Sequence, residues 1–244
     1  MARYDIAPAW FKTPRGRACL VFLREGTNDW NTAFSALNED EYGTRDLAVE
    51  GTFLDIGGHL GTVTLGLLLD NPEARAIVVE PIPENLRLIA RNLEANGVAD
   101  RATVIPGAVG RGDVTIRYAF DGGENELHHA YVGNGVGTPT QAAIPHREVH
   151  YTAVGYRDLL PEGEAALVKI DCEGGEWPVL DQFAAVPVVV GEIHPVDGMG
   201  TPDTLRALLG ATHDITVSGS GPWGFRAVLH AGADLSTAPA LPLG

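Results

Sequence analysis

The stretch Phe53-Leu-Asp-Ile-Gly-Gly-His-Leu-Gly61 decides the prediction of the fold. It begins with apolar residues that fit a buried strand, and it ends in a loop that contains Gly57, Gly58 and Gly61. An acid, Asp55, stands shortly before the first glycine. Glycines let the main chain approach a partner closely, so the loop between this strand and the helix-like segment 62–71 is a candidate binding site.

Strand-like and helix-like segments alternate after this loop. Strands are expected at 76–80, 102–110 with its loop, 166–171 and 186–194, a helix at 83–97, and a terminal strand pair at 215–221 and 225–231. The strands at 53–56, 76–80, 166–171 and 186–194 are continuously apolar, as a parallel sheet with helices on both faces requires. The alternation predicts a doubly wound, mostly parallel α/β sheet with a Rossmann-like arrangement.

Polar residues follow the predicted strands at the points where these strands end. The carboxyl ends of parallel strands share one edge of the sheet, which is where ligands bind in such folds. A site is therefore expected at this edge, built from Asp55, Glu80, Asp171, Glu192 and His194.

The whole chain, residues 1–244, is predicted to be a single domain. Residues 1–50 form an N-terminal cap and residues 51–244 form the core. Segment 112–156 is an excursion from this core, because its ends alternate apolar and polar residues as half-exposed antiparallel strands do. Between them lies the glycine-rich loop 121–147, and long loops of this kind are often lids or binding loops. If this loop is a lid, His128 or His129 is a candidate to meet the substrate; otherwise both are solvated surface residues.

Composition limits the classes of partner. The net charge of −15 argues against nucleic acid and against an anionic membrane, and it favours a neutral or cationic small molecule. No apolar run approaches the ~20 residues of a membrane span, and no signal peptide is recognisable, so a cytoplasmic location is expected. Cys19 and Cys172 fit reduced thiols. The oligomeric state stays open, with a homodimer as one option.

Two nucleotide-like ligands fit the glycine loop. Glu80 follows Asp55 by 25 positions and ends the next strand, where a carboxylate can grip both ribose hydroxyls. A dinucleotide would bring its pyrophosphate to the loop, and Asp55 would disfavour that negative charge. The same acid suits S-adenosylmethionine, which carries an ammonium and a sulfonium, so the methyl donor is the favoured ligand.

Several blocks in a fixed order resemble the FkbM-type methyltransferase family, named for a macrolide O-methyltransferase. They are AIVVEPIPENLRLIARNLEANG, VIPGAVG, YTAVGYRDLL, LVKIDCEGGEWPVL and VVVGEIHP, and the segment REGTNDW is also similar. The most specific block is Lys169-Ile-Asp-Cys-Glu-Gly-Gly-Glu176. The main departure is Gly58-His59, where the family commonly has Ala-Asn.

The resemblance implies a class I methyltransferase sheet of seven strands, with the last strand antiparallel. It also implies roles for particular residues. The methionine part of the donor is expected at Asp55, Gly57, Gly58, His59 and Gly61, the ribose at Glu80, the adenine near Gly107 and Ala108, and the methionine carboxylate and methyl group near Asp171.

The expected activity is S-adenosylmethionine-dependent O-methylation of a small natural product or a saccharide. His194 is the first candidate for a base, since an ordinary imidazole pKa of ~6.5 suits that task, and Asp171 is placed beside it. His194 could instead cap its strand or bond Glu192, and Asp171, Glu173, Glu192 and His194 could instead gather around a divalent metal. Glu173 and Glu176 could also simply open a helix after the strand 166–171.

Two rival functions stay open at this point. One is a NAD-dependent oxidoreductase built on the same kind of sheet. The other is an accessory protein that binds the donor without catalysis, for which the altered Gly58-His59 pair is the only support.

Overall fold

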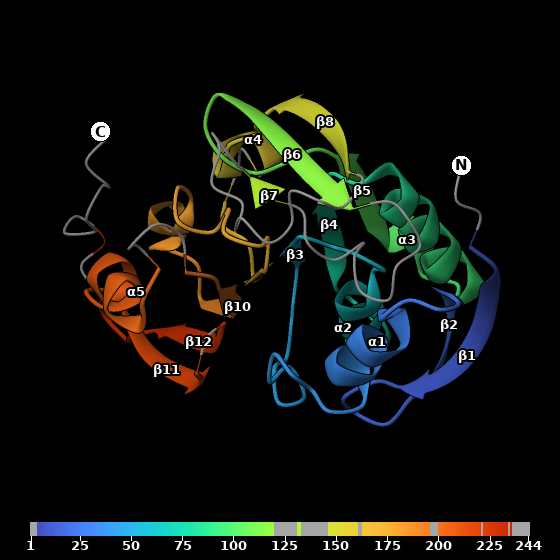
Figure 1. The fold of residues 1–244 in the computed structure, drawn as a ribbon. Helices are drawn as coiled ribbons and strands as arrows, with labels where there is room; N and C mark the ends of the chain where they lie inside the picture. The colour runs from blue at the N-terminus through green and yellow to red at the C-terminus, as the bar shows by residue number, and fades with distance from the viewer. Residues whose placement is uncertain are drawn as a thin grey trace.

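The computed structural model describes residues 4–119, 131–132, 146–160, 163–195, 200–220, 222–233 and 235. A seven-stranded sheet in the order β11-β12-β10-β9-β3-β4-β5 forms its centre (Figure 1). Strand β12 is antiparallel to β10 and to β11, and the other pairs are parallel. The predicted doubly wound sheet is therefore confirmed. Its strands are β3 (Thr52–Ile56), β4 (Arg75–Glu80), β5 (Ala102–Pro106), β9 (Leu167–Ile170), β10 (Val188–Ile193), β11 (His213–Gly219) and β12 (Trp223–Leu229).

Helices cover both faces of this sheet, and this explains why its strands are continuously apolar. Side chains of neighbouring strand residues point to opposite faces, so Phe53 joins one core and Leu54 the other. The helices are α1 (Asp29–Leu37), α2 (Thr62–Asp70), α3 (Pro83–Ala95), α4 (Tyr156–Leu159) and α5 (Pro202–Leu209), with 3₁₀ turns η1 (Ala99–Arg101) and η3 (Leu180–Phe183).

The N-terminal cap is an antiparallel hairpin of β1 (Ile6–Lys12) and β2 (Ala18–Arg24), followed by α1. The hairpin lies along α3 (Figure 1). Asparagine side chains of α3 and its C-cap bond the main chain of β2 in the way that a neighbouring strand would. Asn96 bonds both the N–H and the C=O of Leu20, at 2.9 and 2.7 Å, and Asn92 does the same for Phe22, at 2.7 and 3.4 Å.

The excursion contains an antiparallel sheet of β6 (Asp113–Ala119), β7 (Tyr131–Val132) and β8 (His146–Thr152), which confirms the predicted hairpin. The Tyr151 hydroxyl donates to the carbonyl of Pro81 at 2.8 Å, which fastens this sheet to the segment after β4. The predicted lid residues His128 and His129 lie outside the described residues. Within the described part of the chain, no helix has the length and apolar character that crossing a membrane requires.

Candidate active site

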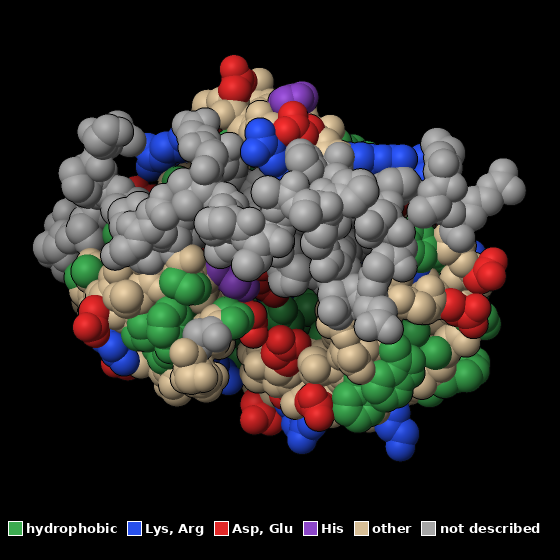
Figure 2. Space-filling model, viewed as in Figure 1, with side chains coloured by type: hydrophobic (Ala, Val, Ile, Leu, Met, Phe, Trp, Pro, Cys, Tyr) green, Lys and Arg blue, Asp and Glu red, His purple; other side chains and the backbone are tan. Residues whose placement is uncertain are grey.

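A cavity of about 660 Å³ lies at the carboxyl ends of the central strands. Figure 2 shows a hollow near the middle of one face, with a histidine and acidic side chains to its left and below it. The order of the sheet puts the ends of β9 and β10 on one side of the cavity and the ends of β4 and β5 on the other. The first side is acidic and includes Asp171, Glu173 and Glu192, with Glu41 of the cap close to Glu192 and Asp171. The second side contains one acid, Glu80, at the end of β4. The apolar lining includes Val79, Ile82, Ala108, Val109 and Ile116.

The glycine loop needs its glycines for shape. Gly57 has φ +81°, and a Cβ at this position would lie 1.9 Å from the carbonyl oxygen of Asp171. A Cβ on Gly58 would lie 2.4 Å from Cγ1 of Val78. His59 has φ +47°, in the left-handed region where Asn, Asp and His occur most readily among residues with side chains. His59 therefore suits this turn as an Asn would, whereas an Ala at position 58 would require Val78 to shift.

Asp55 lies beneath this loop and is not part of the cavity wall. It is fully buried, accepts a 2.6 Å hydrogen bond from the Thr64 hydroxyl, and lies 3.3 Å from Nζ of Lys169. Lys169 in turn donates to the carbonyl of Gly57 at 2.7 Å. Asp55 thus acts on the loop through Lys169, which differs from the direct donor contact that the sequence suggested.

Glu80 lies in the cavity wall and is already well supplied with hydrogen bonds. Its Oε1 accepts from the main-chain N–H of Ile82 at 2.9 Å and from Nδ2 of Asn85 at 3.1 Å, while Oε2 accepts from the N–H of His59 at 2.8 Å. A carboxylate offers about four acceptor positions. One position, on Oε2, remains after these three bonds, so the geometry favours one ribose hydroxyl over the predicted grip on both.

Asp171 receives a hydrogen bond from the cap. The hydroxyl of Tyr42 donates to Oδ2 of Asp171 at 2.7 Å, and Nζ of Lys169 lies 5.3 Å from the centre of the Tyr42 ring. Burial, the charge of Asp171 and that of Glu41 raise the pKa of Tyr42 well above its ordinary value, so the phenol keeps its proton. The cap therefore fixes the orientation of the Asp171 carboxylate.

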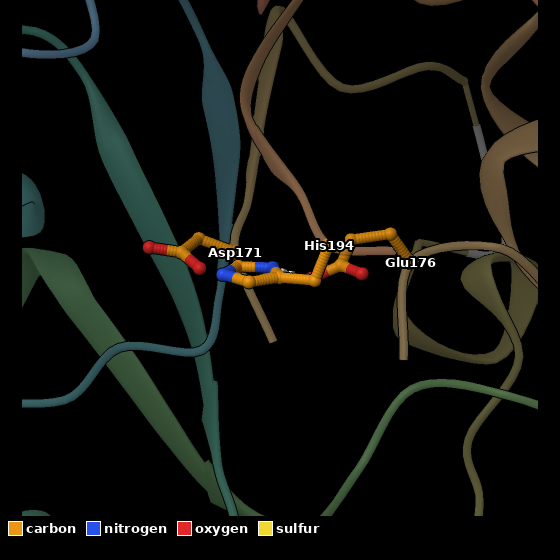
Figure 3. Close-up of side chains that lie close together, drawn as sticks. All are labelled: Asp171, Glu176 and His194. Carbon is orange, nitrogen blue, oxygen red and sulfur yellow. Dashed lines mark hydrogen bonds and ion pairs between the residues drawn. The ribbon is translucent and has the colours of Figure 1, made fainter. Parts of the chain in front are cut away.

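His194 lies between the carboxylates of Asp171 and Glu176 (Figure 3). Its Nδ1 is 3.1 Å from Oε1 of Glu176, and its Nε2 is 3.5 Å from Oε2 of Glu173. Burial opposes the charged form, but the hydrogen bond and charge of Glu176, with the charges of Asp171 and Glu173, outweigh it and raise the pKa of His194 to about 9. At neutral pH this ring is an imidazolium and holds its proton, in contrast to the ordinary imidazole pKa assumed for a base.

Glu176 closes the loop after β9 and does not begin a helix. Its carboxylate accepts from the N–H of Cys172 at 2.9 Å and from that of Gly174 at 3.0 and 3.2 Å. Turns at residues 173–174 and 177–179 precede η3. Among the described residues, Asp171, Glu176 and His194 lie close enough to share a metal ion, with ligand atoms within 4.8 Å of one another. Both oxygens of Glu176 already accept main-chain hydrogen bonds, and Oε1 also pairs with Nδ1 of His194.

Two further carboxylates line the acidic side. Loss of surrounding water, together with the charges of Glu192 and Asp171, raises the pKa of Glu41 to about 7. Burial and the charge of Asp171 also raise the pKa of Glu192. Negative charge is thus concentrated here, which favours a neutral or cationic ligand.

The structure brings most of the predicted site residues to one cavity. Two of the predicted residues, Asp55 and Gly61, are not among the residues that line the cavity. Gly61 is instead the N-cap of α2. The residues that reach the cavity are Gly57, Gly58, His59, Glu80, Gly107, Ala108, Asp171 and His194.

Sequence reasoning assigned no role to five residues that shape the site: Arg24, Asp29, Tyr42, Asn85 and Lys169. Four of them belong to blocks that carry the family resemblance, namely REGTNDW, Glu-Pro-x-Pro-x-Asn and Lys-Ile-Asp. These blocks could have identified them. Tyr42 lies in no such block.

Comparison with known proteins found similar solved structures and a matching family. Solved structures with a similar fold include the precorrin-6y C5,15-methyltransferase from Geobacter metallireducens GS-15 (14% identity, 76% of this chain and 83% of that chain, TM-score 0.44). They also include the C-terminal domain of the precorrin-6Y C5,15-methyltransferase from Rhodobacter capsulatus (15%, 75% and 83%, 0.43) and an O-methyltransferase from Bacillus cereus in complex with SAH (16%, 73% and 74%, 0.44). Similarity at this level identifies no acceptor. A search of the curated proteins gave no match.

The family assignment comes from the sequence of the core. Residues 55–213, which are more than half of the chain, match the family described as the methyltransferase FkbM domain. This range runs from Asp55 at the glycine loop to His213 at the start of β11, and includes the strand ends that form the cavity. The chain therefore belongs to the FkbM methyltransferase family.

Proposed function

We propose that the protein transfers a methyl group from S-adenosylmethionine to a hydroxyl of a small, polar natural product or saccharide. The observation that carries this proposal is the division of the cavity, with apolar residues on one side, Glu80 in its wall and an acidic side around Asp171. This division suits a ligand with a flat base, a ribose and a positively charged end. Family membership supports the same reaction class.

The residues of this chain fit the donor. The apolar lining at Ala108, Val109 and Ile116 would hold the adenine, and Glu80 would accept from the ribose. Gly57 and Gly58 would bring their main chain to the methionine part, where the negative charge of Asp171 favours a cation. When bound, S-adenosylmethionine supplies a methyl group on a positively charged sulfur.

The acidic side would receive the acceptor. Asn28, Asn31, Thr32 and Ser35, contributed by α1 and its N-cap, add amide and hydroxyl groups to the lining. Such walls suit a hydroxyl-rich acceptor that is neutral or cationic, and they disfavour a phosphorylated one.

Asp171 and His194 are proposed to share the chemistry. As a new oxygen–carbon bond forms and the sulfur–carbon bond breaks, the hydroxyl proton would pass to the carboxylate of Asp171. His194, as an imidazolium, would orient the acceptor by donating a hydrogen bond. Alignment of the reacting groups is expected to supply most of the rate enhancement.

The rival functions fit the cavity less well. The pyrophosphate of NAD would face Asp171, Glu173 and Glu192 near the glycine loop, where its negative charge is unfavourable. An accessory protein without catalysis would not need the carboxylates that raise the pKa of His194. Both remain as outcomes of the following experiment.

Calorimetric titration with S-adenosylhomocysteine, and in parallel with NAD, tests the proposal. Micromolar binding of the first and none of the second is expected, and Glu80→Gln should weaken binding of the first by roughly 10- to 100-fold. Incubation with radiolabelled S-adenosylmethionine and a panel of hydroxylated amines and saccharides then tests transfer. Binding without turnover of any acceptor would favour the accessory role, and binding of NAD alone would refute the proposed donor.

A further inference from the structure

We infer that the N-terminal cap is part of the donor site, because Arg24 acts as a positioning residue that sets the Glu80 carboxylate through Asn85 and His59. The inference rests on the proposed function only for the identity of the donor. It assigns to the cap a role in ribose selection, beyond covering the core.

A closed ring of hydrogen bonds carries this inference. Nη1 of Arg24 donates to Oδ1 of Asn85 at 2.8 Å, and Nδ2 of Asn85 donates to Oε1 of Glu80 at 3.1 Å. The main-chain N–H of His59 donates to Oε2 of Glu80 at 2.8 Å. The ring closes where Nη2 of Arg24 lies 3.2 Å from Nε2 of His59. Each oxygen of Glu80 is thus linked through one residue, Asn85 or His59, to a single guanidinium.

The direction of these bonds follows from the chemistry of arginine. A guanidinium has donors and no acceptor, so Oδ1 of Asn85 must be the atom that faces it, and Nδ2 is left to face Glu80. In the same way, Nε2 of His59 must accept, which places the ring proton on Nδ1. Arg24 therefore fixes both the orientation of the Asn85 amide and the tautomer of His59.

Asp29 holds Arg24 in place. It accepts from Nε of Arg24 at 2.8 Å and from Nη2 at 2.9 Å, and its Oδ2 also accepts from the N–H of Arg24 at 2.9 Å. The side chains of Arg24 and Asp29 are only 2% and 0% exposed. A buried ion pair is a costly way to attach a hairpin, because desolvation offsets much of the attraction. The asparagines at 92 and 96 already attach β2 to α3, so the pair's position beside Glu80 calls for a separate explanation.

The environment of Glu80 explains why such support is useful. Burial raises the pKa of Glu80, and the hydrogen bonds from Ile82, His59 and Asn85 oppose that shift. A carboxylate that is ionised and fixed in direction accepts a hydroxyl hydrogen bond more strongly than a neutral or mobile one. Loss of the hydrogen bonds from Arg24 should therefore weaken the contact between Glu80 and the ribose more than any other contact with S-adenosylmethionine.

The test compares two ligands in calorimetric titrations of the full chain. One is S-adenosylhomocysteine, and the other is an analogue that lacks the 2′ and 3′ hydroxyls. The wild type should prefer the first by roughly 10- to 100-fold, which is the range of one hydrogen bond to a charged group. Arg24→Lys keeps the charge beside Asp29 but loses the fork that reaches Asn85 and His59. It should lower the preference by about fivefold or more, while affinity for the analogue stays within about twofold.

Matched variants separate positioning from general damage. Arg101→Lys changes a guanidinium that donates to main-chain carbonyls at 68, 71, 72 and 74, away from Glu80, and should leave the preference unchanged. Asn85→Leu should remove the preference, and it provides a second test if Arg24→Lys does not fold.

The outcomes distinguish the inference from the function on which it rests. If Arg24→Lys, or Asn85→Leu in its place, weakens both ligands equally or leaves the preference intact, the cap only stabilises the fold and the inference is wrong. If the wild type binds S-adenosylhomocysteine no better than the analogue, Glu80 does not read the ribose and the inference also fails. If the wild type binds neither ligand, the proposed donor itself is refuted.

Discussion

Replacing Gly57 with alanine should cost more than the left-handed backbone alone explains. The residue has φ +81°, and a conformation of this kind costs an L-residue with a side chain about 1–2 kcal/mol. The new Cβ would also lie 1.9 Å from the carbonyl oxygen of Asp171, so one main-chain segment must move. Overpacking of this kind costs about 1–3 kcal/mol, which brings the expected loss of unfolding free energy to roughly 2–5 kcal/mol.

Gly51→Ala is the matched control. Gly51 has φ +95°, and a Cβ there meets nothing within 4 Å. This variant should therefore lose only the cost of the left-handed backbone, about 1–2 kcal/mol of unfolding free energy. The gain from a less flexible unfolded chain is the same in both variants and cancels in their difference. Thermal unfolding of a chain of this size converts the remaining difference into a gap of about 2–12 °C between the two melting temperatures.

The assay is thermal unfolding followed by circular dichroism, combined with titration of S-adenosylhomocysteine. Gly57→Ala should also lose donor affinity, because the shifted segment lies in the cavity wall, whereas Gly51→Ala should keep it. Equal melting temperatures for the two variants would refute the reasoning, since they would show that the close approach of Gly57 to Asp171 does not constrain the loop.

Three further predictions concern the charged groups of the site. Because the pKa of His194 is raised from 6.5 to about 9 in the folded state, its contribution to stability should be complete below pH 6.5 and lost as the pH rises through 9. The stability advantage of the wild type over His194→Gln in urea unfolding should shrink across that window, and a constant advantage would contradict the ion pair with Glu176. Exhaustive dialysis against EDTA should change neither the melting temperature nor the affinity for S-adenosylhomocysteine, and a loss restored by Mg²⁺ would reveal a metal at His194. Lys169→Met should lower the unfolding free energy by roughly 3–5 kcal/mol, since it leaves the buried Asp55 carboxylate unpaired. Adding Asp55→Leu should recover most of that loss, and failure to recover it would show that the ion pair is not the cause.

Much of the core could be predicted from the sequence because each central strand is a short apolar run that ends in a polar residue. Burial on both faces produces that pattern locally, so β3, β4, β9 and β10 were expected where they occur. The helix expected at 83–97 was recognisable from Pro83 and Gly97, which act within one turn of its ends. The apolar run of residues 18–23 lies in β2, but nothing in it indicates the partner strand β1, whose residues Ile6–Lys12 include Pro8 and show no regular alternation.

The site was predictable in position but not in chemistry. Strand ends identified which residues meet, yet the pKa of His194 depends on carboxylates at 171, 173 and 176 that surround it only after folding. Likewise, the sequence suggests that Asp55 contacts the methyl donor, whereas in the structure Asp55 pairs with Lys169 of β9. Lys169 also bonds Gly57, which lies 112 residues earlier in the chain. Contacts between segments this far apart leave no local pattern.

The asparagines that bond β2 have a consequence for association between copies of the chain. A two-stranded hairpin leaves a strand edge whose free N–H and C=O groups can pair with another molecule. Here Asn92 and Asn96 occupy those groups at Phe22 and Leu20, so the amides of a helix protect a strand edge from intermolecular pairing. If this hairpin were replaced by the hairpin of a relative, the residues of α3 that face it would have to be replaced as well. Without matching asparagines, the main-chain groups of the strand edge would be free to pair with another molecule.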